Sequence, residues 1–389
     1  MRVVEPATAD EVADVVREAA AQRERIIICG SGKPDDWPFP ADADVLLSSR
    51  RLNRLIAHRH GDLTATVEAG ARLGDVNREL ARHNQWIPLD PPWADELTIG
   101  GIVATNASGP RRHRYGAPRD LIIGVEMVRA DGVRAKAGGI VVKNVAGYDV
   151  SRLLTGSFGC LGVITAASFK LYPRPQASRT IRIDVPSFKV VQELAAAIDR
   201  AQLTPTAVEV QVPPLRALVR FESIDASVAQ QSAGVSDIAA SLGLRADVLD
   251  GADEAREWDT HAARPWGGTS VVASVSCLPA DLGATLEAID HATGGRFDAI
   301  GRAAIGALLV RIDLPQEKQR LAIETLRSRV PPDRGSVVLR RASRDLANAV
   351  GIWGNVGSAM RVMRSVRQSL DPQGTLNQSV WESLARATN

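Results

Sequence analysis

The first 175 residues alternate between the apolar spacing of helices and that of strands. Apolar positions between 12 and 19 share one helical face and follow Thr8-Ala9-Asp10-Glu11, a capping-box sequence whose two ends satisfy each other's backbone donors. An apolar run at residues 26–28 predicts a buried strand that leads into glycine-rich sequence. Asp131-Gly132, between two further apolar runs, predicts a hairpin. The pattern predicts a mixed helix-and-strand domain that ends at the prolines near residue 175.

From residue 179 onward the order of the elements repeats. Strands are expected near residues 181–185, 208–212, 218–221, 271–277, 307–312 and 336–340, and helices near 188–201, 228–242, 281–292 and 316–329. Both sets resemble the β-α-β-β-α-β order of ferredoxin-like units. We therefore expect residues 176–342 to form one antiparallel sheet with its helices on a single face. A last helix is expected near residues 356–370.

Composition narrows the function classes. The 389 residues are enough for two domains, and a net charge of +2 with 4% aromatic residues argues against a nucleic-acid partner. No run of eighteen apolar residues exists, and the first residues lack the apolar core of a signal peptide. The three cysteines, Cys29, Cys160 and Cys277, lie far apart in the sequence. This usage fits a reducing cytoplasm and excludes an iron–sulfur cluster held by this chain alone.

Four segments rich in small residues are candidates for a ligand site. Gly30-Ser31-Gly32-Lys33 follows a predicted strand, as nucleotide-binding loops do, but it lacks the third glycine of a Rossmann loop and Pro34 follows it. A plain turn stays open beside a nest of backbone N–H groups that holds a phosphate. The other segments are residues 98–109, 142–149 and 157–164. Their glycines let the backbone approach a flat ligand, or let neighbouring segments pack closely.

The order and spacing of these segments resemble the FAD-binding domains of the vanillyl-alcohol-oxidase, or PCMH, type. At Gly109-Pro110-Arg111-Arg112 and over residues 142–163 the chain also resembles the FAD-binding subunits of glycolate oxidase. The resemblance covers roughly the first 175 residues and implies an α+β fold. Residues 1–175 would form a PCMH-type FAD-binding domain of two subdomains, and 176–342 a ferredoxin-like cap domain with an antiparallel sheet. A C-terminal helical segment, 343–389, would return to the FAD-binding domain.

The cofactor that the resemblance implies is noncovalent FAD, because the first loop contains no histidine for covalent attachment. The first loop would hold the pyrophosphate, the second segment the pyrophosphate and the flavin, and the third the surroundings of the flavin. The fourth would line either the adenine side or the ring side, which the sequence does not separate. The residues expected to contact the cofactor are Gly30, Ser31, Gly32, Lys33, Pro91, Thr98, Ile99, Gly100, Gly101, Thr105, Asn106, Gly109, Lys143, Asn144, Gly147, Tyr148, Asp149, Gly159, Leu161, Gly162, Val163, Ile164 and Asn377.

Two of these expectations carry alternatives. For Tyr148 and Asp149, a capped and packed helix start stays open. Asn377 corresponds to an asparagine of the family's closing segment that lies by the flavin. Gln378-Ser379 follow it here, where the family usually continues with Pro-Gly. The resemblance therefore leaves the local turn at this position in question.

The resemblance implies the FAD-binding flavoprotein subunit of a glycolate oxidase complex. Such a subunit takes part in the oxidation of glycolate, a small 2-hydroxy acid, to glyoxylate. Electrons would pass to a second flavoprotein subunit and an iron–sulfur subunit, in the cytoplasm, with membrane contact only through these partners. No catalytic base is assigned. Two alternatives stay open, a stand-alone FAD-dependent oxidoreductase of another hydroxyl substrate and a structural subunit that has lost FAD.

Two clusters of polar residues stay outside this scheme. The basic run at residues 111–114, with Arg119, is a solvated face, a phosphate contact or a docking site for an acidic partner. His58 and His60 have no third ligand at a suitable spacing, so no metal site is expected. Related 2-hydroxy-acid dehydrogenases carry a paired-histidine metal site in the cap domain, where this chain has only isolated histidines. That difference argues against substrate oxidation by this chain alone.

Overall fold

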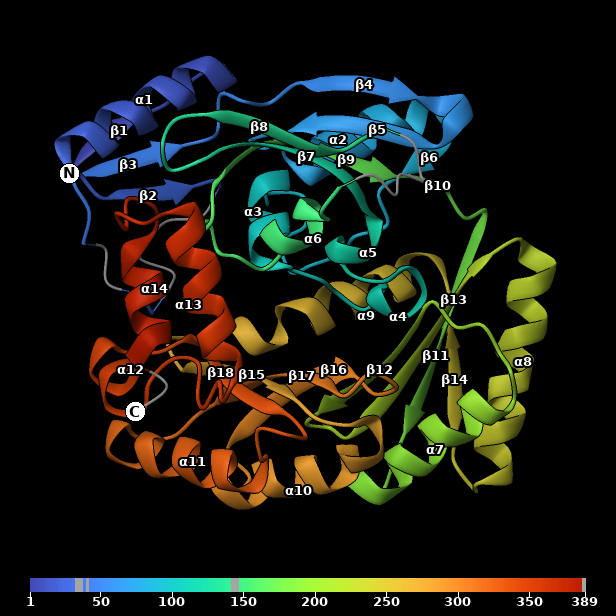
Figure 1. The fold of residues 1–389 in the computed structure, drawn as a ribbon. Helices are drawn as coiled ribbons and strands as arrows, with labels where there is room; N and C mark the ends of the chain where they lie inside the picture. Colours follow the sequence, from blue (N-terminus) through green and yellow to red (C-terminus); the bar gives the residue numbers. More distant parts are fainter. Residues whose placement is uncertain (32–37, 40–41, 141–146, 387–389) are drawn as a thin grey trace. The chain divides into compact units, whose positions relative to one another are not determined.

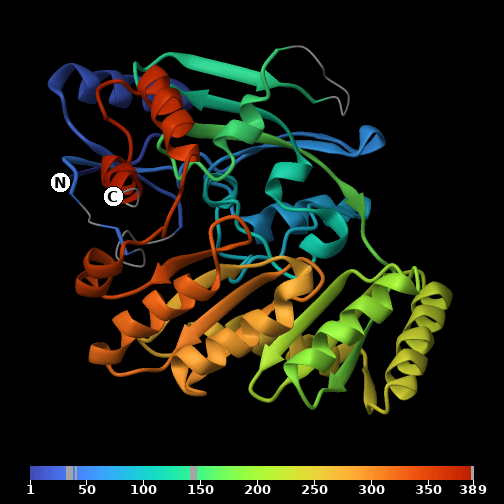
Figure 2. The same cartoon turned by 60° about the horizontal axis from the view of Figure 1, so that its bottom comes forward.

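A computed structural model describes residues 1–31, 38–39, 42–140 and 147–386 of the chain (Figures 1 and 2). The described residues divide into two units. Unit 1 comprises residues 1–109, 115–174 and 358–386, and unit 2 comprises residues 110–114 and 175–357. Within these ranges, no helix is long and apolar enough to cross a bilayer.

Unit 1 contains a small parallel sheet. Its order is β1-β3-β2, formed by β1 (Arg2–Val4), β3 (Val45–Ser48) and β2 (Ile26–Cys29). The strand predicted at residues 26–28 is therefore confirmed, and it lies at one edge of the sheet. Its predicted burial holds for Ile26 alone, because Ile27 and Ile28 are partly exposed at this edge. The C-terminal segment continues this edge, because Leu376 forms a parallel bridge with Ile26.

Helix α1 (Ala9–Gln22) buries its apolar face in the same core as the parallel sheet, and the spacing of its apolar residues predicted that face. Thr8 Oγ1 accepts a hydrogen bond from the backbone N–H of Glu11 at 3.2 Å, as the capping-box sequence predicts. The Glu11 carboxylate, however, accepts from the N–H of Ala7 at 2.7 Å instead of from Thr8. The predicted hydrogen bond from the Thr8 N–H to the Glu11 side chain is therefore wrong. The chain turns one residue earlier, so the N–H of Ala7 is the donor that reaches this carboxylate.

The second sheet of unit 1 is antiparallel with five strands in the order β4-β5-β9-β7-β8. Its strands are β4 (Leu55–Arg59), β5 (Thr64–Glu68), β9 (Val163–Lys170), β7 (Ile122–Val128) and β8 (Arg134–Gly138). The hairpin predicted at Asp131-Gly132 joins β7 to β8 and is confirmed. Gly132 there has a φ of 76°, in the left-handed region that a residue without Cβ adopts at little cost.

Helices cover the core of this second sheet. The buried core includes Val67 of β5, Phe169 of β9, Leu73 of α2 (Leu73–Leu80) and Ile102 of α3 (Ile99–Thr105). The remaining elements of the unit are β6 (Gln85–Trp86) paired with β10 (Tyr172–Pro173), α5 (Pro118–Leu121), α6 (Val150–Leu154), α13 (Ala359–Leu370) and α14 (Gln378–Ala385). A further short helix, α4 (Arg112–Tyr115), begins in the residues assigned to unit 2.

Unit 2 is built on one eight-stranded antiparallel sheet in the order β14-β11-β13-β12-β16-β17-β15-β18. The first half consists of β11 (Ala177–Asp184), α7 (Phe188–Arg200), β12 (Ala207–Val212), β13 (Arg216–Ser223), α8 (Asp225–Ser241) and β14 (Ala246–Leu249). The second half consists of β15 (Val271–Ser276), α10 (Leu282–Thr293), β16 (Phe297–Arg302), β17 (Ala307–Ile312), α11 (Gln316–Arg329) and β18 (Ser336–Arg341), followed by α12 (Arg344–Val350). Each half has β-α-β-β-α-β order, and pairing of β12 with β16 joins them. The predicted ferredoxin-like antiparallel sheet is confirmed.

The prediction that all helices of this sheet lie on a single face is wrong. Helices α7, α10 and α11 pack side by side along one face, as Figure 2 shows. Helix α9 (Gly251–Ala263) covers the other face. This is shown by the hydrogen bond that Trp258 Nε1 of α9 donates to Thr180 Oγ1 of β11 at 2.8 Å. Thr180 alternates along β11 with Ile181, which points to the opposite side of the sheet. The polar residues on this face are partners of α9 and not a solvated surface.

Candidate cofactor site

The first loop and the start of α3 touch each other in unit 1. Gly30 follows β2, and a Cβ on it would stand 2.1 Å from Thr98 Oγ1. Thr98 caps α3 and accepts a hydrogen bond from the N–H of Gly101 at 3.3 Å. The glycine is therefore required so that the loop can reach the threonine. Gly32 and Lys33 lie outside the described residues.

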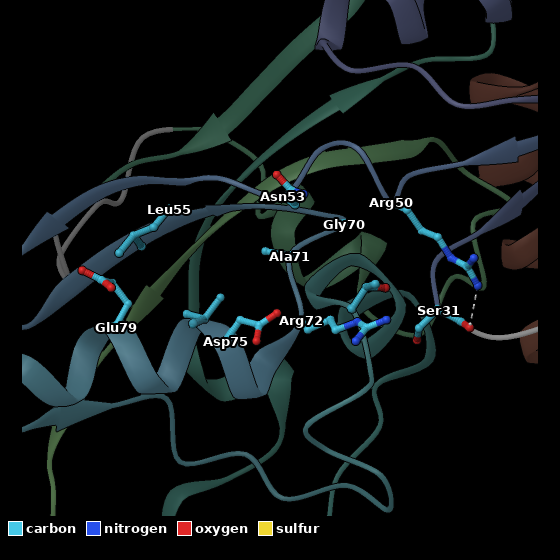
Figure 3. A pocket seen from close by; sticks show the side chains of 11 residues that line it. Ser31, Arg50, Asn53, Leu55, Gly70, Ala71, Arg72, Asp75 and Glu79 are labelled. Atoms are coloured by element: carbon cyan, nitrogen blue, oxygen red, sulfur yellow. Dashed lines mark hydrogen bonds between the residues drawn. The ribbon is translucent and has the colours of Figure 1, made fainter.

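A cavity of about 520 Å³ opens beside this contact (Figure 3). Ser31 and Thr98 line it, as expected for a ligand site at the first loop. The sequence did not single out the remaining lining residues, which are Arg50, Asn53, Leu55, Gly70, Ala71, Arg72, Asp75, Val76 and Glu79. Gly70-Ala71, two small residues that allow close approach of the backbone, are the part of this lining that a sequence pattern could have marked.

Two arginines stand at one end of the cavity. Arg50 donates to the carbonyl oxygens of Gly30 at 3.2 Å and Ser31 at 3.3 Å, which fixes the direction of these peptide groups (Figure 3). The exposed guanidinium of Arg72 has no hydrogen bond or ion pair with any described residue. A guanidinium that none of the described residues pairs with, beside hydroxyl groups and the small residues Gly30 and Ser31, fits an anionic ligand such as a phosphate.

The end of α3 meets the turn at residues 156–160. The N–H of Gly156 donates to the carbonyl of Val103 at 3.0 Å, and the N–H of Phe158 to that of Ala104 at 2.8 Å. Beside this junction, Asn106 Oδ1 and Ser157 Oγ are buried without a hydrogen-bond partner among the described residues. Because buried polar atoms are rarely left unpaired, these two atoms fit a polar ligand that is bound here.

The closing segment joins the same turn to β2. Asn377 Oδ1 accepts from the N–H of Ile28 at 2.8 Å, and Asn377 Nδ2 donates to the carbonyl of Phe158 at 2.5 Å. A Cβ on Gly159 would stand 2.6 Å from this Nδ2 atom. Segments that are hundreds of residues apart in the sequence therefore meet in one place. The first loop, the start and end of α3, the 156–160 turn and Asn377 form a continuous chain of contacts.

Other residues expected to contact the cofactor have identifiable packing roles. The side chains of Ile99, Val163 and Ile164 belong to the apolar cores, so their backbone groups alone are available. A Cβ on Gly100 would meet Ala69 Cβ at 2.8 Å, and one on Gly162 would meet Met127 Cε at 2.3 Å. Similarly, a Cβ on Gly109 would meet the Asp90 carbonyl oxygen at 1.7 Å. Thr105 Oγ1 donates to the carbonyl of Gly101 at 2.8 Å. Pro91 is buried, and Leu161 packs against the core.

The third segment, residues 142–149, contributes the fewest observed contacts to the candidate site. Lys143 and Asn144 lie outside the described residues. Gly147 has a φ of 83° with open space around its Cβ position, and Tyr148 is almost fully exposed. The Asp149 carboxylate accepts from the N–H of Arg152 at 3.0 Å and caps α6. The helix-start alternative for Asp149 is therefore observed, whereas for Tyr148 the helix start is exposed instead of packed.

Neither cysteine near these loops carries a reactive thiol. Burial raises the pKa of Cys160 to about 12, and its Sγ lies 3.6 Å from the carbonyl oxygen of Asn377. Burial also raises the pKa of Cys29, although the charge of Arg50 opposes the change. Since the thiolate is the reacting form, both thiols are structural at neutral pH.

The basic run is partly tied down within unit 2. Arg111 donates to both carboxylate oxygens of Glu222, at 3.0 and 2.7 Å. Burial alone raises the pKa of Glu222, but the hydrogen bonds and charge of Arg111, with the charge of Arg220, lower it overall. Burial lowers the pKa of His113. Arg111 is therefore committed to an intramolecular ion pair, and the solvated-face, phosphate and acidic-partner readings are wrong for this residue.

The structure adds a histidine to the pair noted in the sequence. The ring of His83 lies with its centroid 5.1 Å from that of His58 and 4.6 Å from that of His60. The rings of His60 and His83 are stacked, 4° from parallel, so their nitrogen lone pairs do not converge. Among the described residues, no group of three or more metal-ligating side chains is placed to hold a metal ion.

The isolated His261 of the second unit is a buried hydrogen-bonding residue. Its Nε2 lies 3.0 Å from Glu209 Oε2 and its Nδ1 lies 3.3 Å from Gln211 Oε1. Both partners come from β12, on the face of the sheet that α9 covers. No sequence pattern predicts this contact, because polar residues on one side of a strand are also typical of a solvated face.

Comparison with known proteins supplies the identity of the ligand. A family model described as an FAD binding domain matches residues 1–138. Glycolate oxidase subunit GlcE of Escherichia coli is 35% identical over 181 residues, which are 46% of this chain and 51% of that protein. D-2-hydroxyglutarate dehydrogenase of Xanthomonas citri is 34% identical over 51% of this chain and 42% of its own length. The chain thus spans about half or less of these curated relatives.

A solved structure extends the likeness to the whole fold. Alkyldihydroxyacetonephosphate synthase superposes on 95% of this chain and 75% of its own length, with a TM-score of 0.71 at 18% sequence identity. The two-unit architecture is therefore that of a PCMH-type FAD-binding fold with its antiparallel-sheet companion. Residues 1–138 of this chain match the FAD binding domain family, about half of the chain is similar to a glycolate oxidase subunit, and its cofactor is FAD.

Proposed function

We propose that this chain is the FAD-binding flavoprotein subunit of an oxidoreductase complex that oxidises a small 2-hydroxy acid, with glycolate as substrate and glyoxylate as product. The observation that carries the proposal is the chain of contacts among the first loop, α3, the 156–160 turn and Asn377, with a cavity that opens at Ser31 and Thr98. The names of the curated relatives add the substrate class. They include glycolate oxidase subunits, D-2-hydroxyglutarate dehydrogenase and D-lactate dehydrogenase, all of which are named for 2-hydroxy acids or their oxidation.

Unit 1 supplies the groups that hold the cofactor. The first loop, Thr98 and the guanidinium of Arg72, which no described residue pairs with, would bind the pyrophosphate. The unpaired atoms of Asn106 and Ser157 would hydrogen-bond a polar edge of FAD. No histidine occurs in the first loop, so FAD would be held noncovalently. Bound FAD supplies the acceptor for the pair of electrons that a 2-hydroxy acid loses on becoming a 2-oxo acid.

A partner would receive these electrons. The chain has three cysteines, all free thiols, whereas a cysteine-ligated iron–sulfur cluster needs four thiolates. If the electrons leave through an iron–sulfur cluster, a partner therefore has to carry that cluster. We place a second flavoprotein subunit and an iron–sulfur subunit in this role, with the membrane reached only through them and the complex in the cytoplasm.

Flavin spectroscopy with and without substrate tests the proposal. The purified chain should show flavin absorption, and acid should release FAD into solution. Anaerobic glycolate should not bleach the flavin of the chain alone, but should do so once the partner subunits are added. Bleaching of the isolated chain by glycolate or D-lactate would instead establish a stand-alone oxidoreductase. A colourless protein that FAD does not reconstitute would establish a structural subunit and contradict the proposal.

A further inference from the structure

The carboxamide of Asn377 spans two backbone segments of unit 1. Its oxygen accepts from the N–H of Ile28, two residues before the first loop, and its nitrogen donates to the carbonyl of Phe158, next to Gly159. The backbone of Asn377 adds a third bond to β2, because its N–H donates to the carbonyl of Ile26 at 2.8 Å. One residue thus sets the spacing between β2 and the 156–160 turn.

A buried ion pair holds Asn377 in place. Arg367 of α13 is 3% exposed, forms an ion pair with Asp371 at 2.8 Å, and donates to the carbonyl oxygens of Cys160 and Leu376. Asp371 in turn accepts from the N–H groups of Thr375 at 2.9 Å and Leu376 at 2.8 Å. The turn that carries Asn377 is therefore fixed on both sides, to α13 and to the 156–160 turn.

The spacing set by Asn377 matters because a long ligand has to contact both segments. Gly30 and Ser31 lie beyond Ile28 on one side, and Ser157 with its unpaired hydroxyl lies beside Phe158 on the other. If the two segments are already at the distance that the ligand needs, binding does not have to order them. Sites of this kind lose affinity when their supporting contacts allow displacements beyond about 0.5 Å.

We propose that Asn377 is a positioning residue that holds the first loop and the 156–160 turn at the spacing that FAD requires, with its carboxamide bonded to backbone instead of to the flavin. This inference rests on the proposed FAD site. Its mechanism also explains why asparagine stands here. Aspartate offers no N–H donor to the Phe158 carbonyl, and a φ of 42° is one that asparagine and glycine adopt more readily than other residues.

Ligands of different length separate this role from a general structural one. FAD contacts both segments, whereas ADP contains only the adenosine diphosphate half and riboflavin only the ring half. In N377D, which loses the donor to Phe158, the Kd for FAD should rise at least about tenfold, as one hydrogen bond and the spacing are lost. The Kd values for ADP and riboflavin should change by less than about threefold, since neither ligand spans the gap.

Two further variants control the experiment. N377G keeps a backbone that tolerates the left-handed conformation but removes the carboxamide, and it should reproduce the selective loss of FAD. N84D makes the same chemical change at another left-handed asparagine of unit 1, with a φ of 55°, and should bind FAD as the unaltered chain does. Equal weakening of all three ligands, or unchanged FAD affinity in N377D, would overturn the inference.

Hydrogen exchange on the unaltered protein gives a test that needs no variant. Because coupling between sites is reciprocal, FAD should slow amide exchange at residues 374–378 as well as at 26–31 and 156–160. Exchange at 374–378 that is the same with and without bound FAD would overturn the inference while leaving the proposed function intact. Failure of the unaltered chain to bind FAD at all would overturn both.

Discussion

Arg72 offers the sharpest test of where the FAD phosphates bind. Its side chain lines the cavity, is exposed to solvent, and has no partner among the described residues (Figure 3). Arg72→Gln removes the positive charge and keeps a side chain that can donate a hydrogen bond. Because no described residue forms a hydrogen bond or an ion pair with this guanidinium, the free energy of unfolding should change by no more than about 0.5 kcal/mol.

The expected loss of FAD affinity follows from the exposure of this guanidinium. A hydrogen bond between charged groups contributes about 1.5–3 kcal/mol, and an exposed pair belongs at the lower end of this range. A loss of about 1.5–2 kcal/mol corresponds to a Kd that is roughly tenfold to thirtyfold higher. Riboflavin carries no phosphate, so its affinity should be the same in both proteins.

Quenching of flavin fluorescence during titration of the FAD-free protein measures both dissociation constants. Arg59→Gln is the matched control, because Arg59 is an exposed arginine of unit 1 that does not line the cavity. The difference between Arg72→Gln and the unaltered chain should shrink when salt is raised from about 0.05 to 0.5 M, since exposed charges are screened. FAD binding that is equally tight in Arg72→Gln would refute the assignment of the phosphates to this end of the cavity.

Three further predictions concern buried groups. Arg367→Met removes one member of a buried ion pair and should lower the free energy of unfolding of unit 1 by about 3–5 kcal/mol in denaturant titrations. Arg361→Met, at an exposed position of the same helix, should change it by about 0.5 kcal/mol or less. The pKa of Glu222 lies below its ordinary 4.5 in the folded chain, so its ion pair with Arg111 stabilises the fold above that pH and is lost as the pH falls through the lowered pKa. Glu222→Gln should therefore flatten the acid limb of the stability curve, and an unchanged limb would count against the ion pair. Cys160, with a pKa raised to about 12, should resist iodoacetamide at pH 8 until denaturant unfolds unit 1, and rapid labelling of the native protein would contradict its burial.

The sequence predicted those elements whose apolar spacing is regular. Strand β2, the β7–β8 hairpin and the repeated order of unit 2 follow from periodicity and turn residues alone. Strand β16 was not predicted, because the charged residues Asp298 and Arg302 occupy buried positions in it. Asp298 pairs with Arg264 at 3.0 Å and with Arg311, so the charges are neutralised by partners that are distant in sequence. A pattern of apolar and polar residues does not reveal such pairs.

The candidate cofactor site also has a part that the sequence predicted and a part that it did not. Its loops were predicted because glycine and small residues mark close approach of the backbone, whether to a ligand or to another segment. The side chains that complete it were not, because Arg50 and Arg72 stand in sequence without such a signal. The contact of Asn377 with Ile28 joins residues 349 positions apart. The family resemblance pointed to Asn377 as a site residue. Its bonds to β2 and to the 156–160 turn, however, are seen only in the folded chain.

A crystal structure of the protein with FAD bound would show where the cofactor lies. The diphosphate should lie in the cavity of unit 1, within hydrogen-bonding distance of the Arg72 guanidinium and of the first loop at Ser31. The carboxamide of Asn377 should also keep its bonds to Ile28 and Phe158. A diphosphate bound away from this cavity, or an Asn377 side chain turned onto the flavin, would contradict the proposed site.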